Sequence, residues 1–319
     1  MKNTALEKIQ PYDKATSEFC SAVLSGLRRT PRAIPPKYFY DETGSHLFDA
    51  ICNSPEYYPT RTELQILGSI APEIAEITGP GAVIIEPGCG SAEKVRILLD
   101  RLSPSAYVGM DISGKYLKGV INKLSKAYPT LTVKGLCSDF IRPVNILDIP
   151  LGDRLIFFPG STIGNFEPTD AVNFLKQMAR LARSGGRLLI GVDLKKDPAV
   201  LNAAYNDSEG FTAAFNMNLL ARMNNELDAN FRISQFKHSA FYNEQSGRVE
   251  MHLVSQSEQV VQIDNTHFGF SRNDTIHTEN SYKYSIKEFQ TLARLGDFEP
   301  DKVWTDPDDL FSLHLLNVA

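Results

Sequence analysis

Residues 82–102, AVIIEPGCGSAEKVRILLDRL, set the architecture that we expect for this chain. A β-branched run ends in Glu86, glycines follow at Gly88 and Gly90, and apolar residues then recur at helical spacing. The pattern predicts a strand, a tight turn and a helix. Glycines let the backbone pass close to a ligand, and the amino end of a helix favours anionic groups. The stretch therefore predicts a nucleoside-cofactor site that includes these three residues.

The same alternation of strand and helix continues along much of the chain. Residues 165–184 carry apolar side chains at helical spacing, and Ser285 with Glu288 forms a capping-box pattern at the start of another helix. Two strand-like runs then end the sequence. This order predicts an α/β fold with a doubly wound, Rossmann-like sheet and a terminal β-hairpin. The main predicted strands cover residues 82–86, 106–113, 131–140, 154–161 and 185–194.

Three details favour S-adenosylmethionine over NAD as the cofactor. Asp111 lies 21 residues after the second glycine, where an acid can bind both ribose hydroxyls of either molecule. However, Glu93 stands where a dinucleotide motif has its third glycine, and the charge of Glu86 would repel a pyrophosphate. Asp139 and Phe140 end the third predicted strand, where an acid can accept the adenine amino group and a ring can pack on the base. An NAD-dependent dehydrogenase remains the weaker alternative.

Composition excludes several other classes. The 319 residues carry a net charge of −5, which argues against a nucleic-acid-binding surface. No apolar run approaches the about 20 residues of a membrane helix, and the first residues lack a secretory leader. The four cysteines are scattered, which indicates a reducing cytoplasm. The six histidines show no metal-binding spacing, so we expect no metal site.

Residues 196–283 interrupt the alternating plan with helical segments followed by strand-like alternation. We expect this insertion to form, together with residues 1–60, an α+β substrate-binding domain. The cofactor-binding domain would then comprise residues 61–195 and 284–319. A cleft between two such domains is a common place for a substrate.

The stretch from Pro35 to Leu67 carries six aromatic rings that follow neither a helical nor a strand period. Its segments PKYFYD, LFD and PEYYPTRTE resemble the signature of the histidine-specific S-adenosylmethionine methyltransferases, which make hercynine in ergothioneine biosynthesis. The resemblance continues through nearly the whole chain, in GSTIGN (160–165), TAAFN (212–216), RVEM (248–251) and WTDP (304–307). It implies a methyltransferase sheet. The glycine loop departs from the family pattern at Pro87, Cys89 and Ala92.

The resemblance also implies contacts to the substrate backbone. Tyr40, Phe48 and Gly160 would surround the amino group that receives the methyl. Asn165 and Tyr205 would hold the α-carboxylate. Aromatic walls can also accommodate the trimethylammonium group of a product.

A second set of implied contacts concerns the substrate side chain. Tyr57, Glu279 and Ser281 would bind the imidazole edge, with Met251 packed near the ring. An imidazole offers a donor and an acceptor, or two donors, which a carboxylate with a hydroxyl can satisfy. Lys94 would meet the carboxylate of the cofactor. The sequence identifies no general base.

We therefore expect a monomeric cytoplasmic enzyme that trimethylates the α-amino group of free L-histidine with S-adenosylmethionine. One alternative is the same chemistry on another aromatic amino acid, such as a tryptophan-like one. Another is a catalytically silent protein that binds cofactor or amino acid. A competition assay between amino acids distinguishes histidine from the first alternative substrate. Detectable methylated product excludes the catalytically silent protein.

Overall fold

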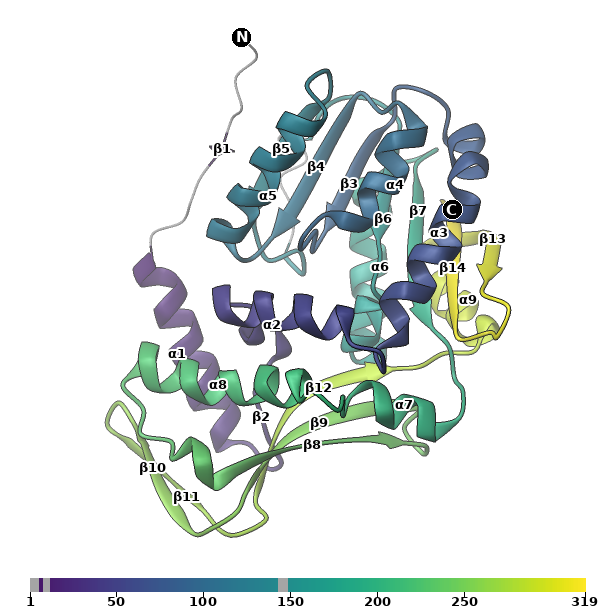
Figure 1. Cartoon of the computed structure of the whole chain (residues 1–319). Helices are drawn as coiled ribbons and strands as arrows, with labels where there is room; N and C mark the ends of the chain where they lie inside the picture. Colours follow the sequence, from purple (N-terminus) through teal and green to yellow (C-terminus); the bar gives the residue numbers. More distant parts are fainter. Residues whose placement is uncertain (1–5, 8–11, 143–148) are drawn as a thin grey trace. The chain divides into compact units, whose positions relative to one another are not determined.

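The computed structural model describes residues 6–7, 12–142 and 149–319, which form two compact units (Figure 1). The first unit comprises Met1–Ile9, Pro59–Lys195 and Tyr282–Ala319, and the second comprises Gln10–Tyr58 and Lys196–Ser281. The short strand β1 (Leu6–Glu7) pairs with a strand of the first unit, although the sequence assigned residues 1–60 to the other domain.

The first unit is built on one eight-stranded sheet with the strand order β1-β5-β4-β3-β6-β7-β14-β13. The strands from β1 to β7 are paired in parallel, whereas β14 runs antiparallel to both β7 and β13. This confirms the predicted α/β class and the terminal hairpin. The strands are β3 (Val83–Pro87), β4 (Ala106–Asp111), β5 (Thr132–Cys137), β6 (Arg154–Phe158), β7 (Arg187–Asp193), β13 (Phe298–Thr305) and β14 (Phe311–Val318).

Helices cover both faces of this sheet, because alternate strand residues point to opposite sides. Ile85 packs in a cluster with Phe174 and Phe289, whereas its neighbour Ile84 packs in a second cluster with Leu67. The predicted capping box at the start of α9 is present. The elements are α3 (Tyr58–Thr78), α4 (Glu93–Leu102), α5 (Gly114–Ala127), η3 (Thr162–Asn165), α6 (Pro168–Ala182) and α9 (Ile286–Leu295).

The second unit combines a four-stranded sheet, in the order β2-β12-β9-β8, with a separate hairpin and four α-helices among the described residues. Its strands are β2 (Arg32–Ala33), β8 (Phe236–Asn243), β9 (Arg248–Ser255), β10 (Gln259–Ile263), β11 (Thr266–Phe270) and β12 (Thr275–Tyr282). Its helices are α1 (Tyr12–Arg28), η1 (Pro36–Phe39), α2 (Glu42–Asn53), α7 (Pro198–Ala204), α8 (Phe211–Leu227) and η4 (Ile233–Gln235). The insertion therefore has the α+β composition that the sequence predicts. Within the described ranges, no helix is long and apolar enough to cross a membrane.

Candidate active site

Three predicted cofactor residues, together with Gly160, lie at or just beyond the carboxyl ends of four neighbouring parallel strands, β5, β4, β3 and β6, whose order Figure 1 shows. Gly88 follows β3, Asp111 ends β4, Phe140 lies just beyond β5, and Gly160 lies just beyond β6. Parallel strands bring their carboxyl ends to the same edge of a sheet, which is where ligands bind in open α/β folds. The first unit thus gathers these residues at one edge.

Direct contacts hold the glycine loop against its neighbours. Gly88 and Gly90 have φ angles of 68° and 49°, a region that favours glycine. A Cβ atom at Gly88 would lie 3.1 Å from Cε1 of Phe140, so the missing side chain permits this close approach. The Asp111 carboxylate accepts the backbone N–H of Gly90 at 3.2 Å and that of Ser113 at 2.9 Å. The predicted ribose and adenine contacts therefore both touch the loop.

The loop fits a nucleoside cofactor in this arrangement. A Cβ placed on Gly90 would meet no atom within 4 Å, so space is open beside the Asp111 carboxylate. Burial raises the pKa of Asp111, although hydrogen bonds from the backbone of Ser113 and Gly90 oppose that shift. Asp139 accepts the backbone N–H of Ile141 at 3.1 Å, immediately beside Phe140. The space beside Gly90 and the Asp111 carboxylate suit a ribose, and the Phe140 ring beside Asp139 suits a base.

Glu86 is buried rather than exposed to a ligand. Its side chain accepts the Tyr107 hydroxyl at 2.6 Å, and only 1% of its surface is accessible. Burial raises the pKa of Glu86 to about 8, so the neutral form predominates at pH 7. That neutral form removes the charge on which the sequence argument against a pyrophosphate rested. The other two details, at Glu93 and at Asp139 with Phe140, are unaffected.

A carboxylate that the sequence analysis overlooked connects the loops after β3 and β6. Glu63 on α3 is fully buried, and its Oε2 lies 2.6 Å from Nζ of Lys94. The same carboxylate accepts the backbone N–H of Gly160, at 2.9 and 3.0 Å to its two oxygens. Gly191 leaves room for it, because a Cβ there would collide with Oε1. Glu63 belongs to the PTRTE segment, which carried the family resemblance without a role for this residue.

The loop after β6 is also fixed from the side of β7. Ser161 adopts a φ of 55°, and its hydroxyl accepts the backbone N–H of Asp193 at 2.9 Å. Asp193 forms a buried ion pair with Lys283 at 2.8 Å. Asn165, the predicted carboxylate contact, ends η3 and is half-buried. The position of Gly160 thus depends on buried polar groups on both sides of the loop.

Aromatic side chains from separate segments form a continuous cluster in the second unit. Three successive pairs of rings lie edge-to-face. The distance between ring centroids is 5.6 Å for Tyr40 and Phe48, 6.4 Å for Phe48 and Tyr57, and 6.3 Å for Tyr57 and Tyr205. Phe215 of α8 contacts this cluster, at 5.5 Å from Tyr40 and 6.0 Å from Phe48. Phe215 belongs to the TAAFN motif, but no role in the site was predicted for it.

Polar groups lie at one end of this cluster. The Tyr205 hydroxyl donates to Oγ of Ser281 at 2.7 Å, and Ser281 and Glu279 are both buried on β12. Burial raises the pKa of Tyr57 well above its ordinary value, and nearby Tyr205 and Glu279 are among the groups that add to the shift. Tyr57 therefore remains a neutral donor. Met251, on the neighbouring strand β9, is 2% exposed.

One hydrogen bond joins a residue predicted to contact the substrate carboxylate to one predicted to contact the substrate side chain. Tyr205 was assigned to the α-carboxylate, yet its hydroxyl is bonded to Ser281, which was assigned to the imidazole edge. The cluster offers aromatic faces, phenol and alcohol hydroxyls, and a carboxylate. Such a set can bind a small molecule that has both cationic and hydrogen-bonding groups.

A doubly wound sheet with this glycine loop, acid-ended β4 and antiparallel terminal hairpin defines the chain as a methyltransferase that uses S-adenosylmethionine. Comparison with known protein families identifies the family within this class. The model of the family described as "Histidine-specific methyltransferase, SAM-dependent" matches residues 19–318, and the chain belongs to this family.

Characterised relatives cover nearly the same length. The chain is 36% identical over 310 residues to a histidine N-alpha-methyltransferase of Mycolicibacterium smegmatis, covering 95% of this chain and 96% of the relative. It is 37% identical over 300 residues to a histidine N-alpha-methyltransferase of Mycobacterium tuberculosis, covering 92% of each chain. A 4-dimethylallyltryptophan N-methyltransferase of Claviceps purpurea is more distant, with 26% identity over 93% of this chain and 94% of the relative.

Proposed function

We propose that this enzyme methylates the α-amino nitrogen of free L-histidine three times and releases hercynine. The observation that carries the proposal is the cluster of Tyr57, Tyr205, Glu279 and Ser281, which combines hydroxyl donors with a buried carboxylate. The two relatives named as histidine N-alpha-methyltransferases support the same substrate.

The imidazole edge explains why a carboxylate and a hydroxyl would lie together. Glu279 would accept an imidazole N–H, and the hydroxyl of Ser281 would donate to the other nitrogen or accept from it. An indole has a single donor and no acceptor, so it would leave one of these buried groups unpaired. A site built to bond a polar edge can reject an analogue without it by about 10⁴-fold or more.

The amino group requires different surroundings. Tyr40 and Phe48 would provide aromatic faces for a nitrogen that becomes a permanent cation after the third methylation, with about 0.5–2 kcal/mol for each favourable contact. Gly160 would border the amino group, and Asn165 would bind the α-carboxylate with Tyr205. Both molecules must be held in line, which can supply about 7–11 kcal/mol of the barrier.

Binding of the methyl donor would rest on the first unit. Its ribose and its amino-acid part would be held by Gly88, Gly90 and Asp111. Glu86 would support the glycine loop from the buried side. Asp139 and Phe140 would contact the base, and Lys94 would face the donor carboxylate. S-adenosylmethionine, when bound, supplies an electrophilic methyl, and these residues orient the donor against an amine that has lost its proton.

We further propose a monomer that acts on a small molecule in the cytoplasm, without a nucleic-acid or membrane partner. The free cysteines among the described residues, Cys20, Cys52, Cys89 and Cys137, suit a reducing compartment.

Mass spectrometry tests this proposal directly. The purified chain is incubated with S-adenosylmethionine and an equimolar panel of free amino acids, and we expect histidine alone to gain three methyl groups. Methylation of tryptophan instead would keep the chemistry and overturn the histidine assignment. Absence of product, together with measurable cofactor binding, would favour a catalytically silent binding protein.

A matched pair of variants tests the imidazole contact. Glu279→Gln keeps the size of the side chain but removes its charge, so we expect kcat/KM for histidine to fall about 10- to 100-fold, in line with the loss of one charged hydrogen bond. Glu258→Gln makes the same change at an exposed position of the same unit and should leave kcat/KM unchanged. Equal kcat/KM values for histidine in the two variants would show that Glu279 does not contact the substrate.

A further inference from the structure

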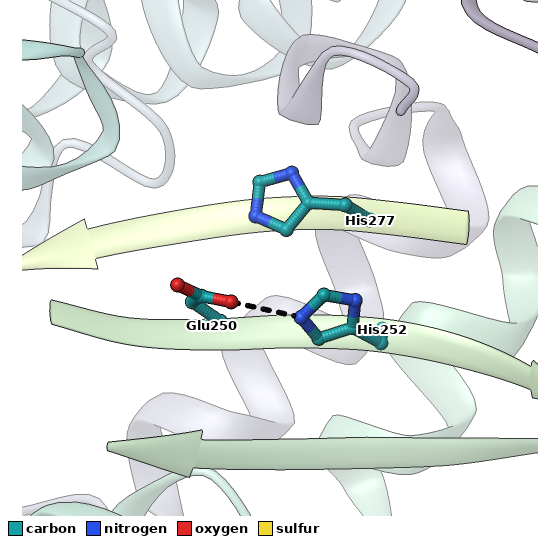
Figure 2. Close-up of side chains that lie close together, drawn as sticks. All are labelled: Glu250, His252 and His277. Carbon is teal, nitrogen blue, oxygen red and sulfur yellow. Dashed lines mark hydrogen bonds and ion pairs between the residues drawn. The ribbon is translucent and has the colours of Figure 1, made fainter. Parts of the chain in front are cut away.

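A carboxylate and two imidazoles converge on adjacent strands of the second unit, apart from the residues proposed to bind substrate. Glu250 and His252 project from β9 and His277 from β12, and Figure 2 shows the three side chains gathered over these strands. One potential ligand atom from each residue lies within 4.8 Å of the others. Two imidazoles and a carboxylate are a donor set typical of zinc and related transition metals.

The strand period separates this cluster from Met251 and from α8. Glu250 and His252 are two residues apart on β9, so they share a face of the sheet, and Met251 between them points to the other. On β12, the residue after His277 is Thr278, whose hydroxyl donates to Asn216 of α8. The cluster therefore lies on the sheet face opposite to α8, and none of its three members is among the residues proposed to bind substrate.

The carboxylate is oriented so that one oxygen faces the histidines. Oε1 of Glu250 accepts Nε of Arg248 at 2.9 Å and Nδ2 of Asn243 at 3.1 Å. Oε2 lies 3.1 Å from Nε2 of His252, and Figure 2 marks this interaction with a dashed line. Two ligands on a tetrahedral zinc ion are about 3.3 Å apart, because each lies about 2.0–2.1 Å from the metal. This oxygen–nitrogen pair is already near that spacing.

His277 completes the set from the neighbouring strand. Its ring centroid lies 5.0 Å from that of His252, and its Nε2 lies 2.8 Å from Oδ1 of Asn280. An amide oxygen at this distance can serve either as a hydrogen-bond acceptor for the imidazole or as a further oxygen ligand. Since all ligand atoms lie within 4.8 Å of one another, the widest pair needs to close by at most about 1.5 Å to reach the tetrahedral spacing. Side-chain rotation alone can provide a movement of this size.

We propose that Glu250, His252 and His277 bind a divalent transition-metal ion of the zinc class, which joins β9 to β12. In the ion-free form, a proton on His252 joins its Nε2 to the Glu250 carboxylate. The ion takes the place of that proton, which passes through solvent to Nδ1 of the same ring, and the ion then accepts lone pairs from the two neutral imidazoles and from Oε2. The guanidinium of Arg248 lies beside the same carboxylate and limits affinity, so the site differs from a buried structural zinc site.

This site was not predicted because its ligands come from two strands. Histidine spacing along a single segment cannot reveal it, because Glu250 and His277 meet only through the strand order β12-β9. Met251 lies between two of the ligands, and Glu279 lies two residues after the third. An ion would thus fix the strands that carry three residues of the proposed substrate site, Met251, Glu279 and Ser281, although its binding does not depend on that proposed function.

Zinc titration of the full chain, after removal of metals with a chelator, tests the proposal. We expect one Zn²⁺ ion to bind the wild type by isothermal titration calorimetry. His252→Gln and His277→Gln should each lower the affinity at least about tenfold, because loss of an outer-shell partner alone costs 10- to 100-fold. His267→Gln is the matched control, because His267 is exposed on β11 of the same unit, and its affinity should stay within about twofold of wild type.

Two results would overturn the proposal. The first is a wild type without saturable zinc binding, which would leave the three side chains as a hydrogen-bond network only. The second is equal zinc affinity in wild type, His252→Gln and His277→Gln. If a ligand variant fails to fold, as judged by its melting temperature without metal, Co²⁺ bound to the wild type decides instead. The visible absorption bands that Co²⁺ shows with nitrogen ligands would support the metal site, and their absence would overturn the proposal.

Discussion

Glu86 couples the stability of this protein to pH, and Glu86→Gln tests that coupling. The glutamine keeps an oxygen that can accept the Tyr107 hydroxyl, now at 2.6 Å, but it cannot ionise. In wild type, burial raises the pKa of Glu86 from 4.5 to about 8. The folded state therefore holds one proton more than the unfolded state between these two values.

The sign follows from this difference in bound protons. Because the folded state binds more protons, the free energy of unfolding of wild type falls as the pH rises from 4.5 towards 8. Below pH 4.5 both states are protonated and the effect disappears. Between pH 6 and pH 8 the loss integrates to about 2 kcal/mol, since each pH unit with a full proton difference is worth about 1.4 kcal/mol.

Urea unfolding of wild type and Glu86→Gln, each at pH 6 and pH 8, measures this loss. Other groups titrate equally in both proteins. The difference in free energy of unfolding between wild type and variant therefore changes with pH only through Glu86. We expect wild type to lose about 2 kcal/mol relative to the variant over this range. A difference that stays constant within about 0.5 kcal/mol would refute a raised pKa at this position.

Three further substitutions test individual contacts. Gly191→Ala should destabilise the fold by about 1–3 kcal/mol in urea, because its Cβ would displace the buried Glu63, and an unchanged midpoint would contradict that packing. Tyr205→Phe should cost about 0.5–1.5 kcal/mol through loss of its hydrogen bond to Ser281, and calorimetric melting of both proteins measures it. Ser285→Ala should cost about 1 kcal/mol by removing the cap of α9, and stability equal to wild type in chemical unfolding would argue against the capping box.

The sequence determined those features that depend on near neighbours along the chain. The β-branched run before Gly88 and the helical period after it are local patterns, and they predict the strand, loop and helix correctly. The capping box at Ser285 spans three residues and is equally local. Strand alternation was sufficient to predict the terminal hairpin and the α+β character of the insertion. The length and order of the family motifs indicated the enzyme class that the comparisons show.

Only the tertiary structure decided which distant side chains meet. Glu63 reaches Lys94 and Gly160 because α3 lies against the loops after β3 and β6, and no local pattern encodes that placement. Glu86 is neutral at pH 7 because burial in the sheet raises its pKa, although the hydrogen bond from Tyr107 opposes that shift, whereas the sequence shows only an acid after a strand. In the second unit, the strand order brings His277 to Glu250 in the same way. Burial and contact between distant residues depend on packing, which the order of residues specifies only through the complete fold.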